Sequence, residues 1–284
     1  MLRKLLKYDL AFVWRWWRII AVIMVVASLL GALLLRGTLA ATDGVQETLI
    51  IICVLYFIPY LLAIVACTAA TPLLLYWRFY SHFYSDQGYL TFTLPVKRRT
   101  LLLSKVYNEL IWHVAQGLLL IFCICLICLI APPATQEYPV INPVAFQFIG
   151  ELFSLLGAMF GLITAIVVLE IVLAILVSTL FQICLVHFCI TIGAVIAKKM
   201  KLLAGIGIYY AVNAALSVAG QVLFGIAGGL MLPGFAAILV GCTKNEGLAF
   251  LMLFGLLFIA IFAAFSVLLY CLTQDKLDRK LNLA

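Results

Sequence analysis

The sequence contains very few charged residues. Only 10% of its 284 residues are charged and 67% are hydrophobic, whereas a soluble domain usually has about 25% charged residues. A chain with so few groups that water can solvate does not form a stable globule in water. We therefore exclude a soluble fold and expect the chain to be surrounded by lipid.

Residues that support catalysis or phosphate binding are also scarce. No lysine follows a glycine anywhere, so the Gly-x-x-x-x-Gly-Lys-Ser/Thr loop that binds ATP phosphates is absent. The histidines, His82, His113 and His187, form no His-Glu-x-x-His motif. Cys125 and Cys128 have the spacing of a metal site, but they stand alone among Leu and Ile residues. We expect no enzymatic activity, no metal site and no cofactor in this chain.

Long apolar tracts separate the few charges and predict membrane-spanning helices. At about 20 residues per hydrocarbon thickness, most tracts are long enough to cross a bilayer. They also lack the alternation of polar and apolar residues that barrel strands show. We expect an all-α integral membrane protein in which residues 1–284 form a single transmembrane domain. The predicted spans cover residues 19–39, 48–76, 106–131, 172–196, 202–224 and 248–272.

The positions of the basic residues predict the orientation of these spans. Lys and Arg beside membrane spans prefer the cytoplasmic side. If the N-terminus is inside, every one of the 18 basic residues except Arg36 and Lys244 falls in a cytoplasmic segment. We therefore expect a multi-pass protein with both termini in the cytoplasm. This placement at span ends also argues against nucleic acid as a partner, although the net charge is +7.

Two stretches do not fit a simple alternation of spans and loops. The tract from Glu151 to Ala197 is too long for a single crossing at 1.5 Å per residue, and residues 225–241 contain several glycines and a proline. We expect an outer-surface or partly re-entrant helix near residues 144–168 and a second re-entrant element after the fifth span. The alternative is a long tilted helix that extends beyond the bilayer.

The first 18 residues predict an amphipathic helix. At 100° per residue, the apolar side chains share one arc and the basic side chains share the other. We expect residues 1–18 to lie in the cytoplasmic interface before the first span. The apolar arc holds Leu2, Leu5, Leu6, Leu10, Val13 and Trp17.

The loop between the second and third spans carries the clearest local signals. Ser85 or Asp86 is suited to cap the start of a short helix, and Pro95 suits the first turn of a second helix that continues into the third span. Tyr89 and Phe92 are candidate anchors for the groove of a partner protein. An interfacial helix that dips these aromatic side chains into lipid is the alternative.

The same loop holds an acidic residue, a glycine, a Leu-Pro-Val turn and basic residues in sequence. These residues are Asp86, Gly88, Leu90, Leu94, Pro95, Val96, Arg98 and Lys105. In this pattern the chain resembles the ABC-2 type permeases of ABC transporters, in particular small permeases of Gram-positive bacteria. The resemblance implies that residues 78–105 form a coupling loop whose helix docks in a cleft of an ATPase. The docking residues that it implies are Ser85, Asp86, Gln87, Gly88, Tyr89, Leu90, Thr91, Phe92, Leu94 and Pro95.

The resemblance also implies a function. The chain is expected to be the membrane-spanning subunit of an exporter in a bacterial cytoplasmic membrane, in contact with lipid and with a second, identical or different, permease. ATP and Mg²⁺ are expected on separate ABC ATPase subunits. The expected substrate is amphipathic or hydrophobic, such as a peptide, a lipid or a drug-like molecule. The alternative is a secondary transporter or channel without an ATPase, although the sequence shows no clear repeat and no buried charge pair.

Polar residues inside the predicted spans are candidate substrate contacts. They are Gln182, His187, Asn213 and Gln221. Hydrogen bonding between helices is the alternative role for each of them. We expect Glu170 at the outer membrane boundary, because a charge at mid-bilayer costs about 2.5–3.5 kcal/mol on insertion scales. A buried proton or substrate site is the alternative for Glu170.

Overall fold

The computed structural model describes residues 2–40, 43–85, 87–93, 95–132, 143–197, 200–241 and 244–279. These residues are almost entirely helical and contain no strand, which confirms the all-α prediction. Helices suit a chain in lipid, because each helix pairs its backbone N–H and C=O groups internally. The helices are α1 (Leu2–Ala40), α2 (Asp43–Tyr84), α3 (Gln87–Thr93), α4 (Arg98–Ile130), α5 (Val144–Phe160), α6 (Leu162–Ile196), α7 (Lys201–Gly241) and α8 (Lys244–Arg279).

Six segments of these helices are long and apolar enough to cross a membrane. They are Arg3–Ala40, Thr48–Tyr84, Arg98–Ile130, Ala165–Ile196, Lys201–Val222 and Gly255–Asp278. Each one covers or overlaps one of the predicted spans. Large apolar side chains, for example Val22, Leu62 and Leu118, are exposed along them. Water disfavours such extensive apolar surface and lipid does not. The chain is a multi-pass membrane protein.

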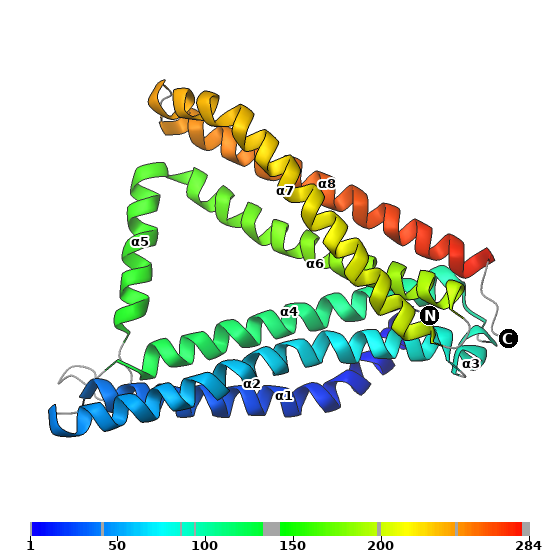
Figure 1. Ribbon diagram of the computed structural model, residues 1–284, viewed down its shortest axis with the longest axis horizontal. Helices are drawn as coiled ribbons and strands as arrows, with labels where there is room; N and C mark the ends of the chain where they lie inside the picture. The colour runs from blue at the N-terminus through cyan, green and yellow to red at the C-terminus, as the bar shows by residue number, and fades with distance from the viewer. Residues whose placement is uncertain are drawn as a thin grey trace. The chain divides into compact units, whose positions relative to one another are not determined.

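The chain forms two compact units, and α2 and α4 contribute to both. The first unit comprises residues 76–106 and 160–284. In this unit α6 packs against both α7 and α8 (Figure 1). The rings of Phe181 on α6 and Phe262 on α8 meet edge to face, with their centroids 5.0 Å apart. The core cluster of this unit contains Phe181, Cys184, Leu185, Cys189 and Leu269.

The second unit comprises residues 2–75 and 107–159 and packs α1, α2 and α4 side by side. One cluster joins Val13, Leu75 and Trp112, and another contains Met24, Leu119 and Cys123. The indole ring of Trp17 lies 5.7 Å from that of Trp14 and 5.3 Å from that of Trp112, measured between centroids. These contacts hold the N-terminal part of α1 against the adjoining parts of α2 and α4.

The N-terminal segment is continuous with the first span. α1 runs without a break from Leu2 to Ala40, so the amphipathic segment predicted for residues 1–18 continues directly into the membrane helix. Val13, on the predicted apolar arc, is buried in the cluster with Leu75 and Trp112, and Trp17 packs against this cluster. Part of the apolar arc therefore contacts protein.

The region predicted as one outer-surface or partly re-entrant helix, residues 144–168, is divided by Gly161. This glycine has a φ of 55°, a left-handed conformation that glycine adopts without the steric cost of a side chain. α5 ends at Phe160 and α6 begins at Leu162. α5 is thus a separate helix, and the remainder of the predicted element forms the first turns of α6.

Residues 225–241, predicted as a second re-entrant element, are helical and continue α7 without a break. This helix continues from Lys201 to Gly241, which agrees with the alternative of a long helix. A continuous helix keeps its backbone hydrogen bonds within itself, as lipid requires. Each glycine in a helix interior costs only about 1 kcal/mol relative to alanine, so the glycines of residues 225–241 do not end the helix.

Candidate docking site

α3 is a short helix between the end of α2 and the start of α4. The backbone N–H of Gly88 donates a 2.8 Å hydrogen bond to the carbonyl of Ser85, so the helix begins just after the predicted cap. At its other end, the hydroxyl of Thr93 donates to the carbonyl of Leu90 at 2.8 Å. Gly88 is the buried residue of the helix. The predicted site residues Asp86 and Leu94 lie outside the described part of the chain.

The outer surface of α3 carries two large side chains. Tyr89 is 54% exposed and Leu90 is 73% exposed. Gln87 and Pro95 are also exposed, whereas Thr91 is half-buried. An aromatic and an aliphatic side chain side by side on a short exposed helix are suited to enter a groove on another molecule.

Phe92, the other predicted anchor, is turned toward its own chain. Its ring meets Phe83 edge to face at 5.8 Å, and the guanidinium carbon of Arg98 lies 5.2 Å from its centroid. Phe92 is half-buried as a result. We therefore assign the outward contact to Tyr89 and Leu90, while Phe92 attaches α3 to α2 and α4.

Two polar contacts hold the helices on either side of α3. The Lys105 ammonium on α4 donates to Nδ1 of His82 on α2 at 2.8 Å. The hydroxyl of Tyr84, at the end of α2, donates to the hydroxyl of Thr191 on α6 at 2.7 Å. Lys105 and Tyr84 are each only 6% exposed, so both contacts are shielded from solvent. α3 therefore projects from a fixed base.

The start of α4 differs from the prediction. We expected Pro95 in its first turn, but Pro95 lies in a bend and α4 begins at Arg98. The N–H of Thr100 instead donates to the carbonyl of Lys97 at 2.9 Å, which places the helix start three residues later. Proline fixes only its own φ near −65°, and this angle suits a bend as well as a helical turn.

The ends of several helices meet around α3 within the first unit. Nη1 of Arg98 donates to the carbonyl of Leu277 in the last turn of α8 at 2.5 Å. Gly193 near the end of α6 lies directly against Gly205 near the start of α7. These helix ends carry Arg78, Lys97, Arg98, Arg99, Lys105, Lys201, Lys276 and Arg279. The basic segments that we predict to be cytoplasmic therefore lie at one end of this unit, together with α3.

Comparison with known proteins identifies no relative. A scan of family models, a search of curated proteins and a search of solved structures each gave no match to this chain. The resemblance of residues 78–105 to ABC-2 type permeases stays a prediction from the motif.

The four polar residues predicted as substrate contacts occupy different environments. His187 is 1% exposed and stacks on Phe79, with the ring centroids 3.8 Å apart. The side-chain amide of Asn213 donates to the carbonyl of Tyr209 on its own helix at 3.0 Å. Gln182 and Gln221 are exposed on α6 and α7. The contacts of His187 and Asn213 are typical of structural roles, and a role of the four side chains in substrate contact stays a prediction.

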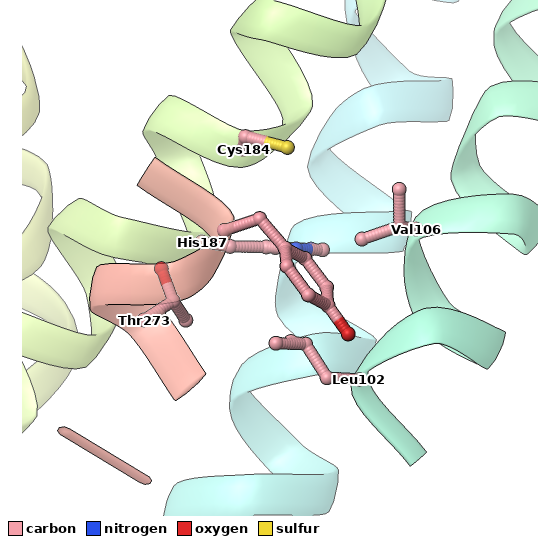
Figure 2. Close-up of a pocket in the computed structure, with 6 residues that line it drawn as sticks. Leu102, Val106, Cys184, His187 and Thr273 are labelled. Atoms are coloured by element: carbon pink, nitrogen blue, oxygen red, sulfur yellow. The ribbon is translucent and has the colours of Figure 1, made fainter. Parts of the chain in front are cut away.

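A small crevice lies beside His187 in the first unit. Residues of α4, α6 and α8 line it, and Figure 2 shows His187 and Cys184 of α6 facing Leu102 and Val106 of α4. The crevice is too narrow for a water molecule. It is therefore a packing gap between these helices.

Glu170 lies near the start of the span Ala165–Ile196, where we predicted a boundary position. The residue is half-buried, and its Oε1 atom is enclosed, with no hydrogen-bond partner among the described residues. Gly255 on α8 leaves room for this carboxylate, because a Cβ atom at position 255 would overlap Oε1.

The contacts that fix the base of α3 were not found from the sequence. Tyr84 and Thr191 are 107 positions apart, and Lys105 and His82 are 23 apart. No local periodicity pairs such residues. The available signal was the presence of polar side chains next to apolar spans, where an internal partner is favoured because lipid provides none.

Proposed function

We propose that this chain is the membrane-spanning permease subunit of an ATP-driven transporter, and that α3 docks a separate ATPase subunit. The observation that carries the proposal is the exposed pair Tyr89 and Leu90 on a short helix with a fixed base, at the basic end of the first unit. The permease motif coincides with this helix. Because the chain has no phosphate-binding loop, ATP hydrolysis has to come from a partner.

The mechanism follows from this arrangement. Closure of two ATPase subunits on ATP displaces α3, and the attached ends of α2, α4 and α6 carry this displacement into the membrane helices. The bundle then alternates between inward-open and outward-open states. Export of an amphipathic or hydrophobic substrate, assembly with a second permease and a bacterial cytoplasmic membrane are proposals that rest on the family resemblance.

The first test is co-purification. The tagged chain, extracted in mild detergent from its native cells, is expected to recover a polypeptide that contains a phosphate-binding loop and hydrolyses ATP. The double substitution Tyr89→Glu and Leu90→Glu is expected to reduce this recovery by at least about tenfold, because burying two charges in an apolar groove costs more than 1.4 kcal/mol.

Matched variants separate docking from folding. Tyr89→Phe and Leu90→Met preserve size and apolarity, so they are expected to recover the ATPase at the wild-type level. Full recovery by the double glutamate variant would contradict docking through α3. Recovery of no ATPase by the wild-type chain would favour a channel or secondary transporter.

A further inference from the structure

Arg98, the first residue of α4, contacts both α3 and α8. Its Nη1 atom donates to the carbonyls of Leu277 at 2.5 Å and Asp278 at 3.3 Å. The guanidinium carbon lies 5.2 Å from the centroid of the Phe92 ring on α3. The Asp278 carboxylate is 4.0 Å away. A single side chain therefore connects the candidate docking helix to the last turn of the sixth span.

The chemistry of arginine suits this position. The last carbonyls of a helix have no partner within the helix, and a cation near them is favourable because the helix dipole is negative there. The flat guanidinium group offers several N–H donors at its edge while its face stacks on an aromatic ring. Arg98 makes both kinds of contact at once, since its Nη1 atom donates to α8 and its guanidinium carbon lies over the Phe92 ring.

The ion pair with Asp278 contributes little to this connection. The two side chains are 41% and 45% exposed, and solvent screens exposed ion pairs so that they contribute about 0–1 kcal/mol. The hydrogen bonds to the α8 carbonyls and the contact with Phe92 are independent of that carboxylate. Leu277, whose carbonyl is the closest acceptor, is fully buried, so it fixes the end of α8 in the unit.

We propose that Arg98 is a positioning residue that makes α3 and the end of α8 move as one body. The proposal rests on the proposed function, since α3 is displaced only if an ATPase docks on it. α8 packs against α6 in the first unit, so a displacement that reaches α8 also reaches α6. This connection gives the docking helix a direct route to the sixth span.

The test measures the distance between α3 and α8 by spin labelling. One label is placed at Thr93→Cys, which is exposed on α3, and the other on Cys271, which is exposed on α8, with the remaining cysteines replaced. In the complex with the ATPase, we expect the wild-type distance distribution to be equally narrow with and without ATP. Arg98→Gln is expected to broaden it by about twofold, because the two helix ends then fluctuate separately.

Three further variants control for charge and folding. Arg99→Gln removes the adjacent, exposed arginine and is expected to leave the distribution unchanged. Asp278→Asn is expected to do the same, because the carbonyl of residue 278 is retained. Arg98→Lys keeps the charge but lacks the planar group, so we expect partial rescue. A general loss of structure would not broaden the distribution in Arg98→Gln, broaden it less in Arg98→Lys and leave it unchanged in Arg99→Gln and Asp278→Asn.

The outcomes separate this inference from the proposed function. Recovery of the ATPase is expected to stay within about twofold of wild type in Arg98→Gln, because Tyr89 and Leu90 are unchanged. If the ATPase binds and the distance distribution of Arg98→Gln equals that of wild type, the role of Arg98 is refuted while docking stands. If the wild-type chain binds no ATPase, the proposed function fails and this inference fails with it.

Discussion

Gln116 is a polar residue that connects α1, α2 and α4 in the second unit. Its Oε1 atom accepts hydrogen bonds from the indole N–H of Trp17 on α1 at 3.0 Å and from the hydroxyl of Thr71 on α2 at 3.1 Å. Gln116→Leu leaves both donors without this acceptor. Hydrogen bonds between membrane helices contribute about 0.6 kcal/mol each on average, so the free energy of unfolding is expected to fall by about 1 kcal/mol. Unfolding by sodium dodecyl sulfate in mixed micelles measures the change.

The control for the buried Gln116 is an exposed glutamine. Gln182 is exposed on α6, so Gln182→Leu removes a polar group from the outer surface of a span and is expected to preserve or increase stability. Equal stability of the two variants would contradict a structural role for Gln116.

At the residue scale, part of the candidate site was predictable. Ser85 or Asp86 was predicted to cap the start of a short helix, and the structure has α3 at Gln87–Thr93. The inward orientation of Phe92 was not predictable, because it depends on Phe83 and on Arg98, which is itself held by α8. Local sequence determines where a helix begins. Which of its faces is outward depends on partners that are distant in the chain.

At the element scale, α6 and α7 approach each other closely at two glycines in the first unit. A Cβ atom on Gly193 of α6 would overlap the backbone of Gly205 on α7, and a backbone cannot rotate aside as a side chain can. Gly193→Ala is therefore expected to separate the helices and to lower the unfolding free energy by about 1–3 kcal/mol, as overpacking does. The same detergent titration measures this effect.

Gly220 provides the comparison within α7. A Cβ atom at this position meets nothing within 4 Å, so Gly220→Ala is expected to be neutral or to stabilise the helix by up to about 1 kcal/mol, the difference in helix propensity. If Gly193→Ala were tolerated as well as Gly220→Ala, the close packing of α6 and α7 would be incorrect.

The elements themselves were largely predictable, because apolar tracts of about 20 residues or more between charges favour membrane spans. All six predicted spans correspond to apolar helical segments. The boundary at Gly161 was missed, since nothing distinguishes this glycine in the sequence from Gly157, which lies within α5. The sequence left the continuity of α7 open as one of two alternatives, because glycines and a proline suggest a break in water but do not force one where the backbone must bond internally.

At the scale of the whole molecule, the orientation in the membrane links the topology to the function. Within the first unit, α3 and Lys201 lie at the same end. Tyr84, next to α3, donates a hydrogen bond to Thr191 near the end of α6, and Gly193 in the same part of α6 contacts Gly205 near Lys201. A cytoplasmic ATPase reaches α3 only if this end faces the cytoplasm. The charge distribution predicts that it does, because the basic residues of the unit gather at this end. The side of the membrane on which Lys201 lies is therefore also the side on which α3 lies.

Cysteine labelling in whole cells tests this orientation. In a variant without native cysteines, Thr93→Cys and Lys201→Cys are expected to react with a membrane-impermeant maleimide only after the cells are opened. Lys244→Cys, at the predicted outer side, is expected to react in intact cells and confirms that the reagent reaches the protein. If Lys201→Cys reacted in intact cells, the charge rule would fail for this chain. Since α3 lies at the same end of the unit, it would then face away from any ATPase, and docking would be excluded together with the orientation.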